Sequence, residues 1–570
     1  MSEYPRPWVQ HYAAGVPAEI EEPTGTLADL IDASIGAYGA GHAALEFFGA
    51  ETTYAQLRDQ IDRAAEGLRQ LGVRAGDPVA IVLPNCPQHI AAFYAILRLG
   101  AIVVEHNPLY TPRELRHQFE DHGAKFAIAW DKVVATIQDF PEDLKPVIVS
   151  VDVTRSMPGL TRAMLRLPIA RARESRAALT AKVSGTVTWE RLLDHAAILD
   201  DVPKPGLDDV ALLQYTSGTT GTPKAATLTH RNLVSNAAQA RAWVPDVQHG
   251  PDCVVYAVLP MFHAYGLTLC LTFAMSMGGR LVLFPRFDPD LVLKVVKKRP
   301  PTFLPAVPPI YQRLQAAAAE RGVSLEGAQV SISGAMPLPT SIVEPWEAAT
   351  GGTLVEGYGL SEASPVLICN PVAPNRRIGT IGLPVPSTEA RVVDPEHPDV
   401  DVPTGEQGEL IVRGPQIMSG YWQKPEETAA VFVPASDGGK PWLRTGDIVR
   451  LEDDGHIVVV DRIKELIITG GFNVMPTEVE EALRRHPAIE DAVVVGLPDP
   501  GAGEQVVAAV VLASGATLDI DAVREFVRGQ LAAYKVPRRL FPVDELPKSL
   551  IGKVLRKQVK ESLLEAPAAG

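Results

Sequence analysis

A chain of 570 residues is long enough to bury a large hydrophobic core and to divide into more than one domain. Its content of 46% hydrophobic and 21% charged residues is typical of a soluble globular protein, and its net charge of −15 argues against a nucleic-acid-binding surface. The 4 cysteines are widely separated, so they predict neither a disulfide framework nor a metal site, but reduced thiols.

Two segments bear on whether the chain enters a membrane. Residues 1–22 contain three prolines and no apolar run, so they do not predict a signal peptide. Residues 253–279 carry no formal charge and are long enough to span a membrane. Because Pro260, His263 and Gly266 interrupt this stretch, we expect a strand, a turn and a buried helix there. These observations predict a cytoplasmic protein.

Alternating strands and helices fill the first part of the chain. Apolar spacing predicts a helix that starts near Thr53 and is closed by Gly72, followed by a strand over 79–83. Asn85 is the expected N-cap of the next helix, which Gly100 ends before a strand over 101–104. This βαβ pattern predicts a parallel sheet, and its recurrence predicts layered α/β subdomains. Further strands are predicted over 126–129, 147–151, 254–259, 281–284, 303–304 and 330–333.

Residues 155–182 differ from their surroundings in composition. Seven basic residues and a single acid, Glu174, lie among leucine, methionine and isoleucine residues. A basic amphipathic stretch of this kind is able to lie on an anionic membrane surface, which would make the protein peripheral at the inner membrane. The alternative is a solvent-exposed connection between two subdomains, and this is the favoured interpretation of the sequence.

The pattern changes after about Ile381. Short alternating strands over 389–393, 409–412 and 456–460, separated by Pro and Gly, predict a small β-barrel-like subdomain. After Asp461 a compact α+β pattern begins. We therefore predict an α/β fold in which an N-terminal domain, over 1–460, holds the layered α/β subdomains and the barrel-like subdomain, and a small α+β domain covers 461–570.

The stretch between predicted strands over 210–214 and 225–229 reads Tyr215-Thr-Ser-Gly-Thr-Thr-Gly-Thr-Pro-Lys224. Its hydroxyl groups, the backbone N–H groups near Gly218 and Gly221, and the charge of Lys224 are groups that bind phosphates. It is not a Walker loop, because Lys224 follows a proline. It resembles the phosphate loop of the adenylate-forming superfamily, which includes acyl-CoA synthetases, firefly luciferase and the adenylation domains of peptide synthetases. The family pattern, Tyr or Phe, then T-S-G, then Ser or Thr, then T-G-x-P-K, is matched at every position. The resemblance implies that the phosphates of ATP are bound by Thr216, Ser217, Gly218, Thr219, Thr220, Gly221 and Lys224.

A second motif, Gly357-Tyr-Gly-Leu-Ser-Glu362, resembles the adenine and metal motif of the same family. The resemblance implies that Tyr358 stacks on adenine and that Ser361 hydrogen-bonds the α-phosphate. It also implies that Glu362 binds Mg²⁺, a hard cation that prefers oxygen ligands. The other nucleotide-binding residues implied by the resemblance are Gly334, Glu356, Gly357 and Gly359.

Three further motifs of the family occur later in the chain. By resemblance, Asp447 would accept hydrogen bonds from the ribose hydroxyls, Arg462 would reach ribose or phosphate, and Lys464 would lie at the hinge of a mobile C-terminal domain. Lys553, in Pro547-Lys-Ser-Leu-Ile-Gly-Lys553, would be the catalytic lysine. A fixed cation at that place lowers the repulsion between a substrate carboxylate and the α-phosphate.

Other residues correspond to the acyl and thiol sites. The stretch Leu259-Pro-Met-Phe-His263 resembles the motif at the acyl pocket, where His263 would line the path between acyl carbon, phosphate and thiol rather than act as a base. Gly470, Gly471 and Phe472 correspond to the segment that lines the tunnel for the pantetheine arm of CoA. Ile468 stands where some relatives carry a lysine, so thiol activation would rely on other groups.

The resemblance covers nearly the whole chain, from about residue 24 to residue 557. It implies an acyl-CoA synthetase that uses ATP, Mg²⁺ and CoA, with Lys224, His263, Glu362 and Lys553 as catalytic residues. The stretches Arg6-Pro-Trp8 and 107–115 look most like bacterial fatty acid–CoA ligases for long or medium chains. The alternatives are an aryl-CoA ligase of the coumarate type, an acyl-AMP ligase that loads a carrier protein, and a non-catalytic relative that binds nucleotide. A homodimer is left open.

Overall fold

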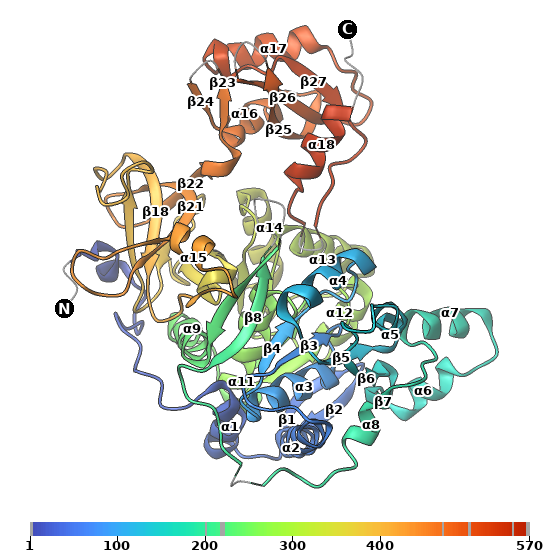
Figure 1. Cartoon of the computed structure of the whole chain (residues 1–570). Helices are drawn as coiled ribbons and strands as arrows, with labels where there is room; N and C mark the ends of the chain where they lie inside the picture. The colour runs from blue at the N-terminus through green and yellow to red at the C-terminus, as the bar shows by residue number, and fades with distance from the viewer. Residues whose placement is uncertain are drawn as a thin grey trace. The chain divides into compact units, whose positions relative to one another are not determined.

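The computed structural model describes residues 4–199, 202–216, 223–469, 472–499, 503–549 and 552–565 (Figure 1). Contacts divide the chain into two units: the first holds residues 1–389 and 413–432, and the second holds 390–412 and 433–570. This division groups residues 390–412 and 433–460 with the C-terminal residues, so the boundary expected at Asp461 stays a prediction. The predicted α/β class is confirmed, with large sheets and helices in the first unit and smaller sheets in the second.

An eight-stranded sheet in the first unit carries the stem of the phosphate loop. Its strand order is β19-β9-β8-β4-β3-β5-β6-β7, and the strands from β8 to β7 in this order run parallel. The strands are β3 (Pro78–Val82), β4 (Ile102–Glu105), β5 (Phe126–Trp130), β6 (Val147–Val151), β7 (Val187–Thr188), β8 (Val210–Thr216), β9 (Lys224–Thr229) and β19 (Gly420–Tyr421). The predicted βαβ unit is confirmed as β3, α3 (Pro87–Arg98) and β4.

A nine-stranded sheet completes the first unit, in the order β16-β15-β14-β13-β12-β10-β11-β1-β2. Its strands are β1 (Ala43–Phe47), β2 (Ala50–Thr53), β10 (Val254–Ala257), β11 (Arg280–Leu283), β12 (Phe303–Ala306), β13 (Val330–Ser333), β14 (Thr353–Gly359), β15 (Val366–Cys369) and β16 (Leu383–Pro384). Asn85 links this sheet to the other one: its amide donates to the carbonyls of Ala257 and Leu259, and its Oδ1 accepts from the N–H of Met261. The N-cap expected at Asn85 is therefore wrong, and Cys86 takes that position.

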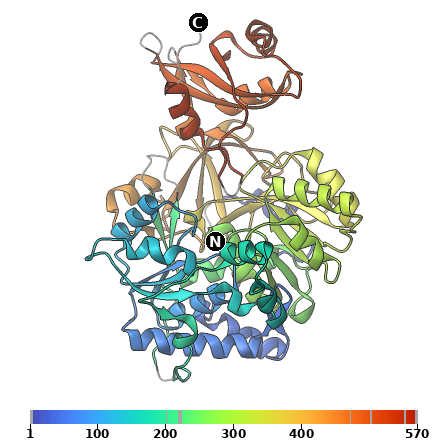
Figure 2. The ribbon, with the colours of Figure 1, turned by 90° about the vertical axis from the view of Figure 1, so that its right-hand side faces the viewer.

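Helices cover the faces of both sheets. Figure 2 shows α4 (Pro112–His122), in blue, on the opposite side of the first unit from α13 (Pro308–Arg321) and α14 (Thr340–Thr350), in yellow-green. The predicted helix after Thr53 is α2 (Tyr54–Leu71), which begins with a capping box of Thr53 and Gln56 and ends at Gly72 with a φ of 113°. The remaining helices of this unit are α1 (Leu30–Tyr38), α5 (Asp131–Gln138), α6 (Gly159–Leu165), α7 (Ala170–Leu179), α8 (Trp189–Leu192), α9 (His230–Trp243), α10 (Ala264–Gly266), α11 (Phe273–Ser276), α12 (Pro289–Val296) and α15 (Pro425–Val431).

The uncharged stretch 253–279 folds as expected. It forms β10, a turn, and then a helical run in which a π-helix, Leu267–Thr272, joins α10 to α11. Nearly all of its side chains are buried within the first unit. Across the described ranges, no helix combines the length and the apolar character that crossing a membrane requires.

The second unit contains two five-stranded sheets. The first has the order β17-β18-β21-β20, with β22 also paired to β21, and the second has the order β24-β23-β26-β25, with β27 paired to β26. The strands are β17 (Glu389–Val393), β18 (Gln407–Arg413), β20 (Phe432–Val433), β21 (Trp442–Leu451), β22 (Ile457–Arg462), β23 (Ile467–Thr469), β24 (Phe472–Val474), β25 (Ile489–Asp499), β26 (Gly503–Leu512) and β27 (Arg539–Pro542). The helices are α16 (Pro476–Arg484), α17 (Ile520–Arg528) and α18 (Arg556–Glu565).

Candidate functional site

The stem of the predicted phosphate loop is an antiparallel strand pair. In the register of β8 and β9, Thr216 lies opposite Lys224, and the Thr216 hydroxyl donates to the Lys224 carbonyl at 3.4 Å. Ser217, Gly218, Thr219, Thr220 and Gly221 lie outside the described residues, so their contacts stay predictions. The stem itself brings the two ends of the loop together.

Glu362 reaches the same place from the other sheet. It follows β14 in a short turn, Ser361–Ala363, and its backbone carbonyl accepts from the N–H of Met418 at 2.8 Å. One of its carboxylate oxygens, Oε1, accepts from the hydroxyl of Tyr421 at 2.8 Å. The Nζ of Lys224 lies 5.4 Å from the centre of the Tyr421 ring, within range of a cation–π contact. Tyr421 therefore joins the predicted metal ligand to the predicted phosphate-binding lysine.

Strand pairing explains why Tyr421 lies there. The two-residue strand β19 adds to the edge of the eight-stranded sheet, where Tyr421 pairs with Ala226, two residues beyond Lys224. Tyr421 is not among the predicted site residues, because so short a strand has no periodicity and the hydrogen-bond partner of Tyr421 is 59 residues away. No local pattern in the sequence signals this contact.

A second set of contacts fixes Tyr421 and the loop stem to α4. The hydroxyl of Tyr215 donates to Oδ2 of Asp121 at 2.8 Å, and the Nζ of Lys424 donates to Oδ1 of the same carboxylate at 2.9 Å. The N–H of Lys424 donates to the carbonyl of Tyr421 at 3.2 Å. One carboxylate on α4 therefore holds both the strand that leads into the phosphate loop and the segment that carries Tyr421. Asp121 and Lys424 are not among the predicted site residues, because their contacts join segments that are far apart in the sequence.

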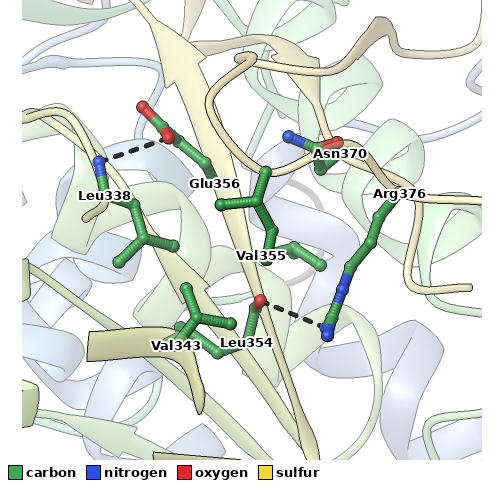
Figure 3. A pocket seen from close by; sticks show the side chains of 8 residues that line it. Leu338, Val343, Leu354, Val355, Glu356, Asn370 and Arg376 are labelled. Atoms are coloured by element: carbon green, nitrogen blue, oxygen red, sulfur yellow. Dashed lines mark hydrogen bonds between the residues drawn. The ribbon is translucent and has the colours of Figure 1, made fainter. Parts of the chain in front are cut away.

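Glu356 occupies a more enclosed position on β14. Its Oε2 accepts from the N–H of Leu338 at 3.2 Å, and its carbonyl accepts from the N–H of Asn370 at 2.8 Å. Figure 3 shows the carboxyl group pointing toward Leu338, in a small cavity that Asn370 and Arg376 also line. Burial raises the pKa of Glu356 to about 8. At neutral pH this side chain is therefore mainly a neutral acid next to Gly357 and Tyr358.

Other predicted nucleotide residues follow the ends of neighbouring strands. Gly334 comes directly after β13, and its N–H donates to the Ala306 carbonyl at 3.3 Å. At Gly359 a Cβ atom would lie 1.9 Å from the carbonyl oxygen of Pro365, so only glycine fits there. Tyr358 pairs with Ile368 of β15 and is partly exposed. The edge where these strands end is where open α/β sheets bind ligands.

His263 has a fixed orientation at the start of the buried helical run. Its Nδ1 accepts from the N–H of Tyr265 at 3.3 Å, so in the neutral ring the proton is on Nε2. The Tyr265 hydroxyl in turn donates to the carbonyls of Ala306 and Ile332, at 3.0 and 2.7 Å. A ring held in place through Nδ1 is consistent with the predicted role of His263, which is to line the path between the acyl carbon, the phosphate and the thiol. This role stays a prediction.

The other predicted site residues lie in the second unit. Asp447 and Arg462 are paired across β21 and β22, with 2.9 Å between Oδ1 and Nε, and the Asp447 side chain is 2% exposed. Burial, followed by the nearby charge of Arg462, lowers the pKa of Lys553 to about 8, although Glu465 and Asp447 act in the opposite direction. The unit therefore gathers Asp447, Arg462 and Lys553 into one charged group.

Several residues predicted to line the thiol site are described only in part or lie outside the described residues. Gly470 and Gly471 lie outside the described residues, and of Phe472 and Lys464 only the backbone is described, in β24 and in the turn Ile463–Glu465. Ile468, which stands where some relatives carry lysine, is 57% exposed. The roles assigned to these residues stay predictions.

Comparison with known proteins agrees with this fold and its motifs. The family model described as "AMP-binding enzyme" matches residues 32–422, and the model "AMP-binding enzyme C-terminal domain" matches residues 478–553. A long-chain-fatty-acid–CoA ligase of Bacillus subtilis (strain 168) is 38% identical over 98% of both chains. A 4-coumarate–CoA ligase of Oryza sativa subsp. japonica is 34% identical over 90% of this chain and 88% of its own length.

A solved structure extends the likeness to three dimensions. The crystal structure of ATP-bound MatB from Rhodopseudomonas palustris superposes with a TM-score of 0.78 at 29% identity, and the match covers 94% of this chain and 98% of that one. The fold is that of the adenylate-forming enzymes. The chain belongs to the AMP-binding enzyme family.

The contact between Tyr421 and Glu362 gives a first prediction. In Tyr421→Phe, Glu362 loses the hydrogen-bond donor that orients its carboxylate, so we expect the Mg²⁺ concentration for half-maximal ATP-dependent activity to rise about 10-fold, as for the loss of a hydrogen bond to a charged group. The measurement is a Mg²⁺ titration at fixed free ATP. Tyr38→Phe is the matched control, because it removes a tyrosine hydroxyl that bonds His249 instead. Equal titrations for both variants and the wild type would show that Tyr421 does not orient Glu362.

The largely enclosed acid Glu356 gives a second prediction. Its pKa in the folded state, about 8, lies above the ordinary value of 4.5, so between these values the folded chain keeps a proton that the unfolded chain releases. The free energy of unfolding therefore decreases as pH rises from about 4.5 to about 8. Glu356→Gln lacks this contribution, and we expect its stability relative to the wild type to increase by about 1–3 kcal/mol across that window.

The measurement is thermal unfolding of both proteins at a series of pH values. Glu406→Gln, which removes an exposed carboxylate, serves as the control. A difference between Glu356→Gln and the wild type that stays constant with pH would contradict the burial of a neutral carboxyl at this position.

Proposed function

We propose that this chain is an ATP-dependent fatty acid–CoA ligase. It converts a carboxylic acid, ATP and CoA to acyl-CoA, AMP and pyrophosphate through an acyl-adenylate. The observation that carries this proposal is the 38% identity, over 98% of both chains, to a protein named long-chain-fatty-acid–CoA ligase. The chain carries the adenylate-forming motifs along that whole length, with Lys224 and Glu362 brought to one tyrosine.

The first half-reaction joins two anions. Lys224 and the phosphate loop would hold the β- and γ-phosphates of ATP, and Glu362 would hold Mg²⁺, which neutralises phosphate charge when bound. The Glu362 side chain fits this role because it is a partly exposed carboxylate whose Oε1 already has a fixed donor in Tyr421. Lys553 would lie between the substrate carboxylate and the α-phosphate, where a cation stabilises the transition state. Below a pH of about 8 Lys553 is charged and suited to this task.

The second half-reaction needs different groups. We propose that the C-terminal domain, beyond a hinge at Lys464, turns so that Lys553 leaves the adenylate and Gly470, Gly471 and Phe472 line the path of the pantetheine arm. His263 would line the route between the acyl carbon and the thiol. Asp447 and Arg462 would hold the ribose through both steps.

The buried helical run after His263 supports an alkyl substrate. Its residues from Ala264 to Met275 are all buried and carry no charge, so the wall of the proposed acyl pocket is apolar. We expect alkanoic acids with roughly eight or more carbons to be better substrates than cinnamates and benzoates, with each buried methylene contributing about 0.8 kcal/mol until the pocket ends.

The test is a panel of alkanoic and aryl acids with ATP and CoA, with the specificity constant measured for each and the thioester identified by mass. Higher specificity constants for aryl acids would favour the second candidate, an aryl-CoA ligase, which the 34% identity to a 4-coumarate–CoA ligase supports. Adenylate formation without any thioester would point to an acyl-AMP ligase that loads a carrier protein.

The proposed division of labour predicts unequal effects on the two half-reactions. Lys553→Ala should slow adenylation by on the order of 10²-fold, because a cation is lost from the transition state. Thioester formation from supplied acyl-AMP should change much less. Lys548→Ala is the matched control, since Lys548 lies in the same segment and pairs with Asp491 at 3.4 Å.

Single-turnover kinetics measure each step separately. The adenylation rate of the wild type should also decrease above a pH of about 8, as Lys553 loses its proton, whereas Lys553→Arg should keep its charge at higher pH. Equal slowing of both steps by Lys553→Ala would contradict the alternating use of the C-terminal domain.

A further inference from the structure

Two short helices extend from one edge of the first unit. Between β6 and β7 the chain leaves the eight-stranded sheet and forms α6 and α7, which project beyond the other helices near that edge (Figure 1). We call residues 159–179 the helical hairpin. Over these residues only Ala172 is buried, so the hairpin contributes almost nothing to the core of the unit.

The hairpin exposes large apolar side chains. Leu160 is 75% exposed, Met164 50%, Leu167 47% and Ile169 54%. Leu160 and Met164 are four residues apart on α6 and therefore share a face of that helix. Single exposed apolar side chains are common on protein surfaces, whereas exposed apolar patches mark interaction sites, and here four such side chains lie within ten residues of chain.

The same segment is strongly basic on an acidic protein. The net charge of the whole chain is −15, yet residues 155–182 contain a single acid, Glu174. Among the ion pairs of the described residues, a single one involves a basic residue of this segment. It joins Arg155 to Asp152 at 3.7 Å. The basic residues are Arg155, Arg162, Arg166, Arg171, Arg173, Arg176 and Lys182.

Hydrogen bonds fix the base of the hairpin to the end of β5 and the start of α5. The Trp130 indole donates to the carbonyl of Leu179 at 2.7 Å, and the Nζ of Lys132 donates to the carbonyl of Ala177 at 2.8 Å. The Thr180 hydroxyl donates to Oδ2 of Asp131 at 2.8 Å. The apolar and basic side chains are therefore presented on an ordered support, which lowers the entropy lost on binding.

We propose that the helical hairpin docks this protein on the surface of a bilayer rich in anionic lipids. The apolar side chains of Leu160, Met164, Leu167 and Ile169 enter the boundary between headgroups and acyl chains, and the arginines contact lipid phosphates. Nucleic acid would also attract the arginines, but its phosphate backbone offers no apolar phase for the exposed leucine, methionine and isoleucine side chains to enter. The solvent-exposed connection that the sequence favours would explain the basic side chains of the segment but not its exposed apolar ones.

This inference rests on the proposed function in one respect only. A long-chain carboxylic acid partitions into bilayers, so a docked ligase would meet its substrate where that substrate is concentrated. Docking itself is a property of the hairpin and is measured without any turnover.

The experiment is co-sedimentation of the full chain with vesicles of phosphatidylcholine alone or with added phosphatidylglycerol, at low and high salt. We expect binding to the anionic vesicles at low salt, release at high salt, and at least about 10-fold weaker binding to neutral vesicles, since each basic residue near an anionic surface adds to the attraction. The triple variant Arg162→Glu, Arg166→Glu and Arg173→Glu should lose this binding. The double variant Leu160→Ser and Met164→Ser should weaken it about 10-fold or more, because it removes the apolar insertion.

The matched control makes the same charge change elsewhere on the first unit, at exposed residues Arg113, Lys297 and Lys298, each replaced by glutamate. It should bind as the wild type does. All variants should keep the wild-type unfolding temperature and the wild-type rate with a short, water-soluble acid, which separates a failure of docking from a failure of the proposed function.

Four results would overturn the proposal. They are equal binding to neutral and anionic vesicles, no binding to either, the same loss in the control triple as in the hairpin triple, and undiminished binding of the Leu160→Ser and Met164→Ser variant. A wild type that binds duplex RNA but not vesicles, together with a hairpin triple variant that binds neither, would assign the surface to a nucleic acid instead.

Discussion

The antiparallel pairing of β8 with β9 is the constraint on which the proposed site depends. It places Thr216 opposite Lys224, so the two ends of the phosphate loop are fixed although the loop contains almost no side chain that a core would retain. The addition of β19 to the free edge of β9 then brings Tyr421 beside Lys224, and Tyr421 reaches across to Glu362 at the end of β14. Groups from both sheets thereby meet at one phenol ring.

Charge gives a physical reason for carrying Lys553 on the second unit, while Lys224, Glu362 and Tyr421 lie in the first. A carboxylate and the α-phosphate of ATP repel each other, so the chemistry needs a cation between them, and a buried lysine loses part of its charge to desolvation. Lys553 shows this cost, since burial and Arg462 lower its pKa to about 8. In the proposed mechanism the same cation is required for adenylation and obstructs thioester formation, so it is best carried on a part of the chain that can leave. This is the physical reason for expecting Lys553 beyond a hinge.

The sequence predicted features that local chemistry determines. The βαβ unit around β3 and β4 follows from apolar periodicity and glycine stops, and the phosphate loop follows from an ordered motif between two strands. Tyr421, Asp121 and Lys424 were not predicted, because their contacts join segments that are far apart and no local pattern marks them. The position of Asn85 before a helix is typical of an N-cap, but its side chain instead makes tertiary contacts with the neighbouring sheet. The raised pKa of Glu356 depends on burial, which composition does not reveal.

The central claim is that the carboxylate attacks the α-phosphorus of ATP and that the thiol then cleaves the acyl adenylate. The most direct test supplies a fatty acid whose carboxyl oxygens are both ¹⁸O, with ATP and CoA, and analyses the products by mass. If the account is correct, the attacking oxygen remains on the phosphorus when the thiol breaks the acyl C–O bond, so AMP carries one heavy oxygen and pyrophosphate carries none. Heavy oxygen in inorganic phosphate together with ADP, or unlabelled AMP beside labelled acyl-CoA, would contradict it.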